Sequence, residues 1–284
     1  MSSARRACGF TLIELIMVMV LIGALAVIGG LLIVQPFRAS ADIARRARLT
    51  DQADLITDRI TREVRAALPN SVRIGSSNQA VEFISTRTGG RYRRYPKSGG
   101  GGNVLKPAQP SGTFDVLGGL PDIGKVDTRA AGTDCANGAG DCITIYNTGQ
   151  TGYDAYNGDN IAAVTAKTDN VGNDQLTYDT GGSGPAFKTH SPRQRFYVID
   201  HVVSYVCNTA AGTLRRYSDY GLNATQSVPP SGTGALVADD ISGCTFQYQP
   251  GTSSRQGLLT MNVALTRGGE TVTLMAQAHV VNAP

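Results

Sequence analysis

The chain has 284 residues, of which 41% are hydrophobic and 17% charged, and its formal net charge is +4. This length could supply one large domain or two small ones. So mild a positive charge does not predict a nucleic-acid-binding protein. Glycine is frequent, with 34 residues, and 20 of them lie between Gly89 and Gly184. The middle of the chain is therefore predicted to be rich in loops.

An apolar run occupies residues 10–34, directly after a short basic leader that contains Arg5 and Arg6. As an α-helix, this run would be about 37 Å long, enough to cross a hydrocarbon core with some tilt. The leading arginines predict a cytoplasmic N-terminus and export of the rest of the chain. Glu14 is the only ionisable side chain within the run. Placing a carboxylate in a bilayer-length helix costs at least ~2.5 kcal/mol of free energy. The presence of Glu14 therefore predicts that this side chain has a functional role.

Residues 9–16 read GFTLIELI. Together with the basic leader, they resemble the prepilin signal of type IV pilins and type II secretion pseudopilins. The resemblance implies that a prepilin peptidase cuts between Gly9 and Phe10, that Phe10 is then N-methylated, and that the apolar helices pack in the core of a filament. The alternative is a conventional secretory signal, which is cut after its apolar core. Gly29-Gly30 could pass for such a site, but the apolar run continues to Val34.

The filament that this resemblance implies also suggests a role for Glu14. Cleavage exposes a positive amine on Phe10, and an unpaired amine or carboxylate is costly in an apolar core. Pairing of Glu14 with the Phe10 amine of a neighbouring subunit would relieve both charges and set the axial register. The alternative is that Glu14 reaches the membrane surface or is protonated.

A second helical pattern follows the apolar run. Between Arg38 and Leu68, apolar residues recur at intervals of three and four, with charged residues between them, which predicts an amphipathic helix. Pro69-Asn70 is expected to end it, and Pro36 is expected to kink or loosen it. The chain thus divides into a leader (1–9), a membrane or filament-core helix (10–34), an amphipathic helix (35–68) and a β-rich exported domain with glycine-rich loops (69–284).

Alternating patterns beyond residue 70 predict β-strands. The candidates are 80–86, 143–146, 195–200, 202–208 and 244–248, followed by a hairpin of 258–266 and 270–281 around Arg267-Gly268-Gly269. Glycine-rich stretches at 98–102 and 118–140 are predicted to be loops. The mixture predicts an α+β fold in which the long helix packs on an antiparallel sheet. Pilins have the same architecture, so the resemblance and the pattern agree.

Five cysteines are present, and cleavage of the leader would remove Cys8 and leave four. An even number in an exported domain predicts disulfides. Four cysteines permit three pairings; we favour Cys135 with Cys142 and Cys207 with Cys244, since each pair lies within one compositional block. A zinc site is the alternative, but no CxxC motif is present and the histidines lack ligand spacing. We therefore expect no metal and no cofactor.

Other chemistry has weaker support. Oxygen-bearing side chains cluster at 153–160, but the spacing does not fit a calcium-binding EF-hand, and calcium binding there stays open.

The basic and aromatic stretch 91–95 could contact a polyanion, although such a stretch in a strand is more often an exposed face. A membrane-anchored hydrolase would need a nucleophile with its base, and no G-x-S-x-G motif is present. We expect no enzyme.

Several segments later in the chain resemble one particular group of pilins. Residues 195–200, 203–207 and 241–246 look like those of the MshO-type minor pilins of mannose-sensitive haemagglutinin (MSHA) pilus systems, as do 145–147 followed by 153–160. Within this resemblance, Cys207 and Cys244 look like a pair that bridges two neighbouring strands. It implies a single-pass protein of the inner membrane with a periplasmic C-terminal domain, which can enter a pilus.

These features predict a minor pilin that helps to initiate or cap a pilus, close to its tip. The partners implied are prepilin peptidase, other minor and major pilins, the inner-membrane assembly platform and, through residues 10–34, membrane lipid, but no nucleic acid. A J-like minor pseudopilin of a type II secretion system is the alternative within this class. An adhesin module at the pilus tip is a further alternative that does not exclude the first.

Overall fold

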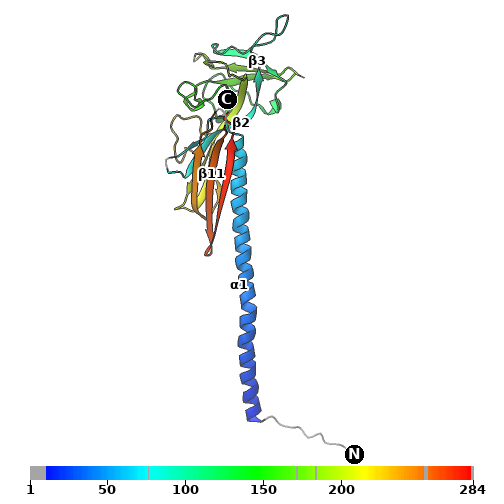
Figure 1. The fold of residues 1–284 in the computed structure, drawn as a ribbon, viewed down its shortest axis with the longest axis vertical. Helices are drawn as coiled ribbons and strands as arrows, with labels where there is room; N and C mark the ends of the chain where they lie inside the picture. The colour runs from blue at the N-terminus through cyan, green and yellow to red at the C-terminus, as the bar shows by residue number, and fades with distance from the viewer. Residues whose placement is uncertain (1–10, 76, 171, 183, 253–254, 283–284) are drawn as a thin grey trace, which may run out of the picture.

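A single long helix dominates the computed structural model, which describes residues 11–75, 77–170, 172–182, 184–252 and 255–282. Helix α1 (Leu12–Arg65) has 54 residues and begins with Thr11 as its N-cap. Figure 1 shows that roughly its first half projects away from the β-rich part of the chain. Pro36, which was expected to kink or loosen the helix, does not interrupt it, because α1 is continuous through this residue. A proline removes a single backbone donor, and the helix extends for many residues on both sides.

The second half of α1 carries the predicted apolar stripe. Its members are all buried: Leu49, Ala53, Ile56, Ile60, Val64 and Ala67. The helix ends at Arg65, before the expected Leu68. Two features account for this: the N–H groups of Ala66 and Ala67 bond to carbonyls three residues back, and the N–H of Leu68 donates to the Ile84 carbonyl at 2.8 Å. The chain thus leaves the helix by joining a strand.

The stripe packs on a small antiparallel sheet, which consists of β10 (Ile241–Gln249), β11 (Gly257–Arg267) and β12 (Glu270–Val280). The predicted C-terminal hairpin is confirmed: Arg267 pairs with Glu270, and Gly268 and Gly269 have φ angles of +59° and +85°. Positive φ at both central residues is typical of a tight type I′ turn. The α+β fold predicted from the sequence is therefore the fold of the structure.

The remaining strands form a large sheet. They are β1 (Arg73–Ile74), β2 (Ala80–Tyr92), β3 (Ser111–Leu117), β4 (Asn137–Thr144), β5 (Ile161–Thr168), β6 (Gln175–Asp179), β7 (Arg195–Asn208), β8 (Thr213–Ser218) and β9 (Ala235–Ala238). The strand order is β1-β2-β3-β6-β5-β4-β7-β8-β9, and β7 also pairs with β2. That last pairing closes β2, β3, β6, β5, β4 and β7 into a ring of antiparallel strands, which we call the closed sheet. Two short 3-10 helices, η1 (Ile123–Lys125) and η2 (Ala155–Asn157), lie in its loops.

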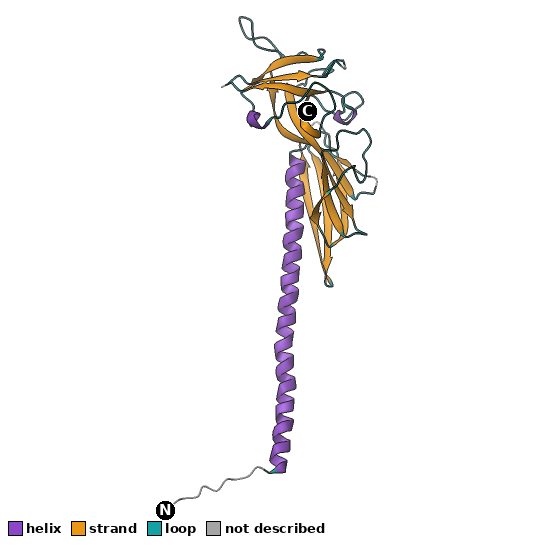
Figure 2. Ribbon diagram, turned by 180° about the vertical axis from the view of Figure 1, so that it is seen from behind, coloured by secondary structure: helices purple, strands orange, loops and turns teal. Residues whose placement is uncertain are grey.

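Strands β2 and β7 are long enough to contribute to three cores, one of which contains Ile84 and Ile199. Near α1, Phe83 and Tyr205 belong to the core that contains the helix stripe. Farther along, Tyr92 and Phe196 belong to a second core of mainly aromatic and branched side chains inside the closed sheet. The closed sheet lies beyond the C-terminal end of α1 (Figure 1), and the view from behind shows the same arrangement (Figure 2). The β-rich part of the chain is thus one continuous body with two ends.

Two details differ from the sequence-based expectations. The segments 195–200 and 202–208 form one strand, β7, although its pairing with β2 is irregular at Asp200 and His201, whose side chains enter a polar network. The predicted loop 118–140 contains η1 and the first residues of β4.

The disulfides join different parts of this fold. The four cysteines are paired as Cys135–Cys142 and Cys207–Cys244, with Cα–Cα distances of 5.9 and 6.4 Å. Cys207 belongs to β7 of the large sheet and Cys244 to β10 of the small sheet. The two strands lie next to each other, as expected, but they do not pair, so the bond connects two sheets. Cys8 lies outside the described residues.

Candidate functional site

Residues Leu12–Gly29 of α1 form an apolar helix segment that no other described part of the chain covers. Within Leu12–Gly29, a stretch of 18 residues has a mean hydropathy of 2.7, and none of it is buried in the structure. Its large apolar side chains are exposed from Leu12, at 78%, to Ile28, at 56%. So large an exposed apolar surface marks a contact with a membrane or another protein. Length and composition fit a membrane-crossing helix.

Glu14 lies in the first turn of this helix, and its side chain is exposed. Its backbone N–H donates to the Thr11 hydroxyl at 3.4 Å. A carboxylate near a helix N-terminus is stabilised by the exposed N–H groups and the helix dipole. Arg5, Arg6, Gly9 and Phe10, to which the sequence assigns the leader and the cleavage and methylation positions, lie outside the described residues.

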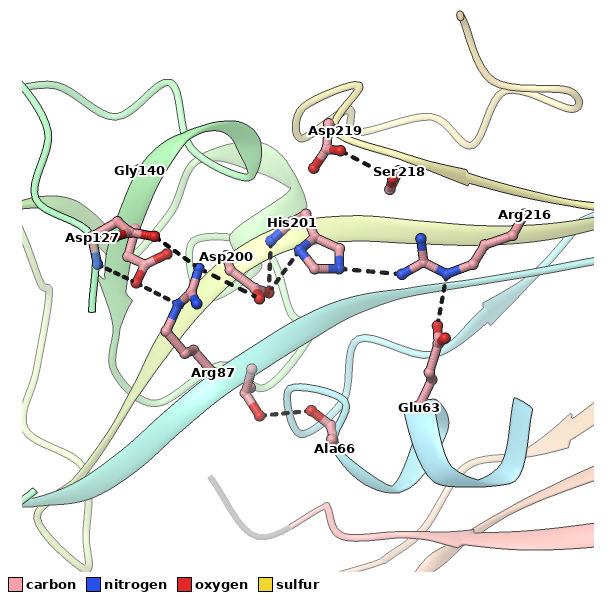
Figure 3. Close-up of polar contacts among 12 residues, drawn as sticks. Glu63, Ala66, Arg87, Asp127, Gly140, Asp200, His201, Arg216, Ser218 and Asp219 are labelled. Carbon is pink, nitrogen blue, oxygen red and sulfur yellow. Dashed lines mark hydrogen bonds and ion pairs between the residues drawn. The ribbon is translucent and has the colours of Figure 1, made fainter. Parts of the chain in front are cut away.

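A chain of polar side chains connects the other end of α1 to the large sheet (Figure 3). Arg216 of β8 donates from Nε to Glu63 of α1 at 2.9 Å, and its Nη2 lies 3.3 Å from Nε2 of His201. A guanidinium only donates hydrogen bonds, so Nε2 must accept and Nδ1 of His201 carries the proton. That Nδ1 faces Asp200 Oδ1 at 3.1 Å. The sequence analysis did not identify these residues.

The network continues into the closed sheet through Arg87 of β2. Arg87 lies 2.8 Å from Asp141, 3.2 Å from Asp127 and 4.0 Å from Asp200. Burial raises the pKa of Asp141 despite its contact with Arg87. For Asp200, burial acts in the same direction, but the hydrogen bonds from His201 and Ser85 outweigh it and hold the pKa below its ordinary value. The network therefore contains a carboxylate that folding favours in its charged form.

Asp200→Asn should lower the free energy of unfolding by roughly 1–2 kcal/mol at neutral pH, because it removes a charged partner of His201. The pKa of Asp200 is lowered in the folded state, so its stabilisation is present above the ordinary value of 3.8 and is lost as the pH falls through the folded-state pKa. The difference between wild type and variant should thus shrink below about pH 4. Urea unfolding of the full chain in a non-ionic detergent measures it.

Asp219→Asn is the matched control, since Asp219 is exposed and contacts only the neighbouring Ser218 among the contacts drawn in Figure 3. It should change the stability by less than about 0.5 kcal/mol. An Asp200→Asn effect that is equal at neutral and acidic pH would show that charge is not its cause.

Comparison with known proteins identifies the N-terminus. Residues 4–30 match the prokaryotic N-terminal methylation motif. The chain carries a type IV pilin-like prepilin motif. The match includes Gly9, Phe10 and Glu14, and it extends into the exposed apolar half of α1. No curated protein and no solved structure matches the chain.

This prepilin motif changes the interpretation of the exposed helix. It implies processing by a prepilin peptidase and contact with other pilins, and together with the apolar helix it suggests membrane anchoring. The motif suggests a structural protein rather than an enzyme. Among the described residues, no group of three or more His, Cys, Asp or Glu side chains could hold a metal ion.

The segment 153–160, where the sequence left calcium binding open, has other contacts. Asp154 caps η2 by accepting from the Tyr156 N–H at 3.0 Å. Asn160 accepts from the Lys188 N–H at 2.8 Å, and Asp159 lies 3.5 Å from the Lys188 ammonium. The oxygen atoms are directed to turns and to a cation of the chain itself.

Proposed function

We propose that this protein is a minor pilin, processed by prepilin peptidase between Gly9 and Phe10 and N-methylated at Phe10. Before assembly, the apolar half of α1 holds it in the inner membrane as a single span, with the N-terminus cytoplasmic and the β-rich part periplasmic. The observation that carries the proposal is the combination of the methylation motif at 4–30 with an apolar helix that projects bare from the domain. The exposed apolar surface of such a helix can contact lipid before assembly and the helices of other pilins after it.

The shape of the exported part supports a place at one end of a filament. The small sheet lies beside the second half of α1, and the closed sheet extends farther, beyond the helix end (Figures 1 and 2). In a filament the N-terminal helices pack side by side, so each subunit above must fit over the one below. A body that extends past the end of α1 would collide with the next subunit along the shaft, but at the tip no subunit follows. We therefore propose that the protein initiates or caps assembly.

The pilus system is the finer part of the proposal. The resemblance of blocks 195–200, 203–207 and 241–246 to minor pilins of MSHA systems supports an MSHA-type pilus. The proposed partners are the peptidase, the major and minor pilins of that system, and its inner-membrane assembly platform. Capture of secretion-system components in place of pilins would instead support a pseudopilin of type II secretion.

Quantitative mass spectrometry of sheared, purified filaments tests the role. We expect the protein at a small fraction of the major subunit, with immunogold label concentrated at filament ends. A copy number close to that of the major subunit, with label along the whole shaft, would contradict a role in initiation or capping.

A further inference from the structure

A groove on the outer face of the closed sheet has features of a binding site. It has a volume of about 350 Å³ and runs across the end of β2 and the start of β7, where it is lined by Thr86, residues 89–91 and residues 195–197. Arg91 also pairs with Leu117 at the end of β3, and β3 lies at the end of the molecule away from α1 (Figure 1). One end of the groove, at Thr86, is bonded to Ala66 at the C-cap of α1, so the groove lies at the opposite end of α1 from its apolar half.

Two arginines face each other across this groove. Arg91 of β2 and Arg195 of β7 are direct partners in the antiparallel register, so their Cβ atoms lie roughly 5 Å apart on the same face. Like charges in this position destabilise a sheet. No Asp or Glu is among the described residues that line the groove. A bound anion would reduce the repulsion between these two guanidinium groups.

Arg91 differs from its neighbours Arg87 and Arg93, whereas Arg94, which also pairs with no carboxylate among the described residues, lies over the Tyr95 ring at 5.4 Å. Arg87 lies 2.8 Å from Asp141, and Arg93 donates to Asp115 at 2.9 Å. Arg91 is exposed and makes no side-chain hydrogen bond or ion pair with any residue that the structure describes. A sequence that supplies two neighbouring arginines with carboxylates leaves this one free to bind a ligand.

Bare backbone at Gly89 and the side chains of Tyr197 and Arg195 form the surface of the groove beside Arg91. At Gly89, a Cβ atom would lie 3.0 Å from the Phe196 carbonyl and 3.1 Å from the Tyr197 ring, so the ring lies across the bare backbone. Tyr197 hydrogen-bonds Arg195, and burial raises the pKa of its phenol, which therefore stays neutral at physiological pH. Arg195 is held in place by this contact, while Arg91 can adjust.

We propose that this groove binds the carboxylate or phosphate of an anionic sugar. Arginine pairs with such groups through two parallel hydrogen bonds, and Arg91 supplies them while Arg195 neutralises the remaining charge. The groove is at the small end of the range for ligand pockets, which fits one or two sugar units. A nucleic acid would need a longer basic surface, and the chain has a net charge of only +4.

Calorimetry on the full chain in a non-ionic detergent tests the proposal with four probes. Trigalacturonic acid presents carboxylates, glucose 6-phosphate presents a phosphate, galactotriose is the neutral control, and a single-stranded DNA oligonucleotide tests the polyanion alternative. We expect binding of at least one anionic sugar and none of galactotriose. The preferred probe tells whether the natural ligand is a uronate or a phosphorylated sugar. Arg91→Gln should weaken that binding by about tenfold or more.

Two further variants separate ligand binding from general charge and from folding. Arg193→Gln removes one charge from an exposed position next to β7 but outside the groove, and should change the affinity by less than about twofold. Arg91→Glu places opposite charges across the strands, so it should abolish binding while the melting temperature stays the same or rises. Equal affinity of Arg91→Gln and wild type, equal binding of the neutral sugar, or binding of DNA alone would overturn the proposal.

Discussion

Glu14→Ala is expected to leave leader cleavage largely intact and to reduce incorporation into filaments at least tenfold. The structure places this carboxylate in the first turn of a bare apolar helix, in the segment that matches the methylation motif. In a packed filament core, a carboxylate without a partner costs several kcal/mol. The proposed partner is the N-terminal amine of Phe10 on a neighbouring subunit, so the alanine variant would leave that amine unpaired and the register unspecified.

Immunoblots of cell membranes and of sheared filaments check this expectation, with the processed form measured in both. Glu14→Asp serves as the matched variant, because it keeps the charge and shortens the reach by one methylene group. It should restore part of the incorporation. Incorporation of Glu14→Ala at the wild-type level would contradict the pairing role.

Loss of the Cys207–Cys244 disulfide is expected to have the largest effect on the stability of the β-rich part of the chain. The bond joins β7 of the large sheet to β10 of the small sheet across 37 residues. By the loop-entropy model, it contributes about 4 kcal/mol, whereas Cys135–Cys142 contributes about 2.5 kcal/mol, since it spans only 7 residues. The double variant Cys207→Ala/Cys244→Ala should therefore unfold at clearly lower urea than Cys135→Ala/Cys142→Ala.

Urea unfolding of the two double variants in parallel measures this difference, and each is the control for the other. Limited proteolysis adds a local readout, because the segment 209–240 between the paired cysteines should become easier to cleave. A larger loss of stability in Cys135→Ala/Cys142→Ala than in Cys207→Ala/Cys244→Ala would contradict the expectation that the bond between the two sheets contributes most to stability.

Some elements were predictable because their pattern is local. The stripe from Leu49 to Ala67 repeats every three or four residues along one helix. In the hairpin around Gly268-Gly269, β11 alternates buried and half-buried residues, and most of β12 alternates half-buried and exposed residues. In each case the information lies within a few neighbouring residues, so the sequence alone was sufficient.

The closed sheet was not predictable in the same way. Its strands β3, β5 and β6 lie in the glycine-rich middle, and β6 has only 5 residues. Their partners are remote: Phe114 of β3 pairs with Leu176 of β6. A ring of strands depends on such long-range pairings, and no local pattern reports them. The split predicted within β7 has a related cause, since the half-buried pair Asp200-His201 resembles a turn until its partners are known.

The candidate sites also differ in whether their residues are close together in the sequence. The prepilin motif is a contiguous signal, and comparison with known proteins confirms it. The network around His201 joins Glu63 to Arg216 across 153 residues, so no spacing in the sequence indicates it. The groove at Arg91 was visible only as a basic and aromatic stretch, because its second arginine comes from another strand.

Intact-mass and N-terminal peptide spectrometry of the membrane-extracted protein, from cells with and without prepilin peptidase, tests the central claim most directly. Processing as a pilin predicts a mature chain that starts at N-methylated Phe10, formed only when the peptidase is present. A chain that starts at Met1 in both strains, or one cut beyond Val34, would contradict it and leave an ordinary anchor or secretory signal.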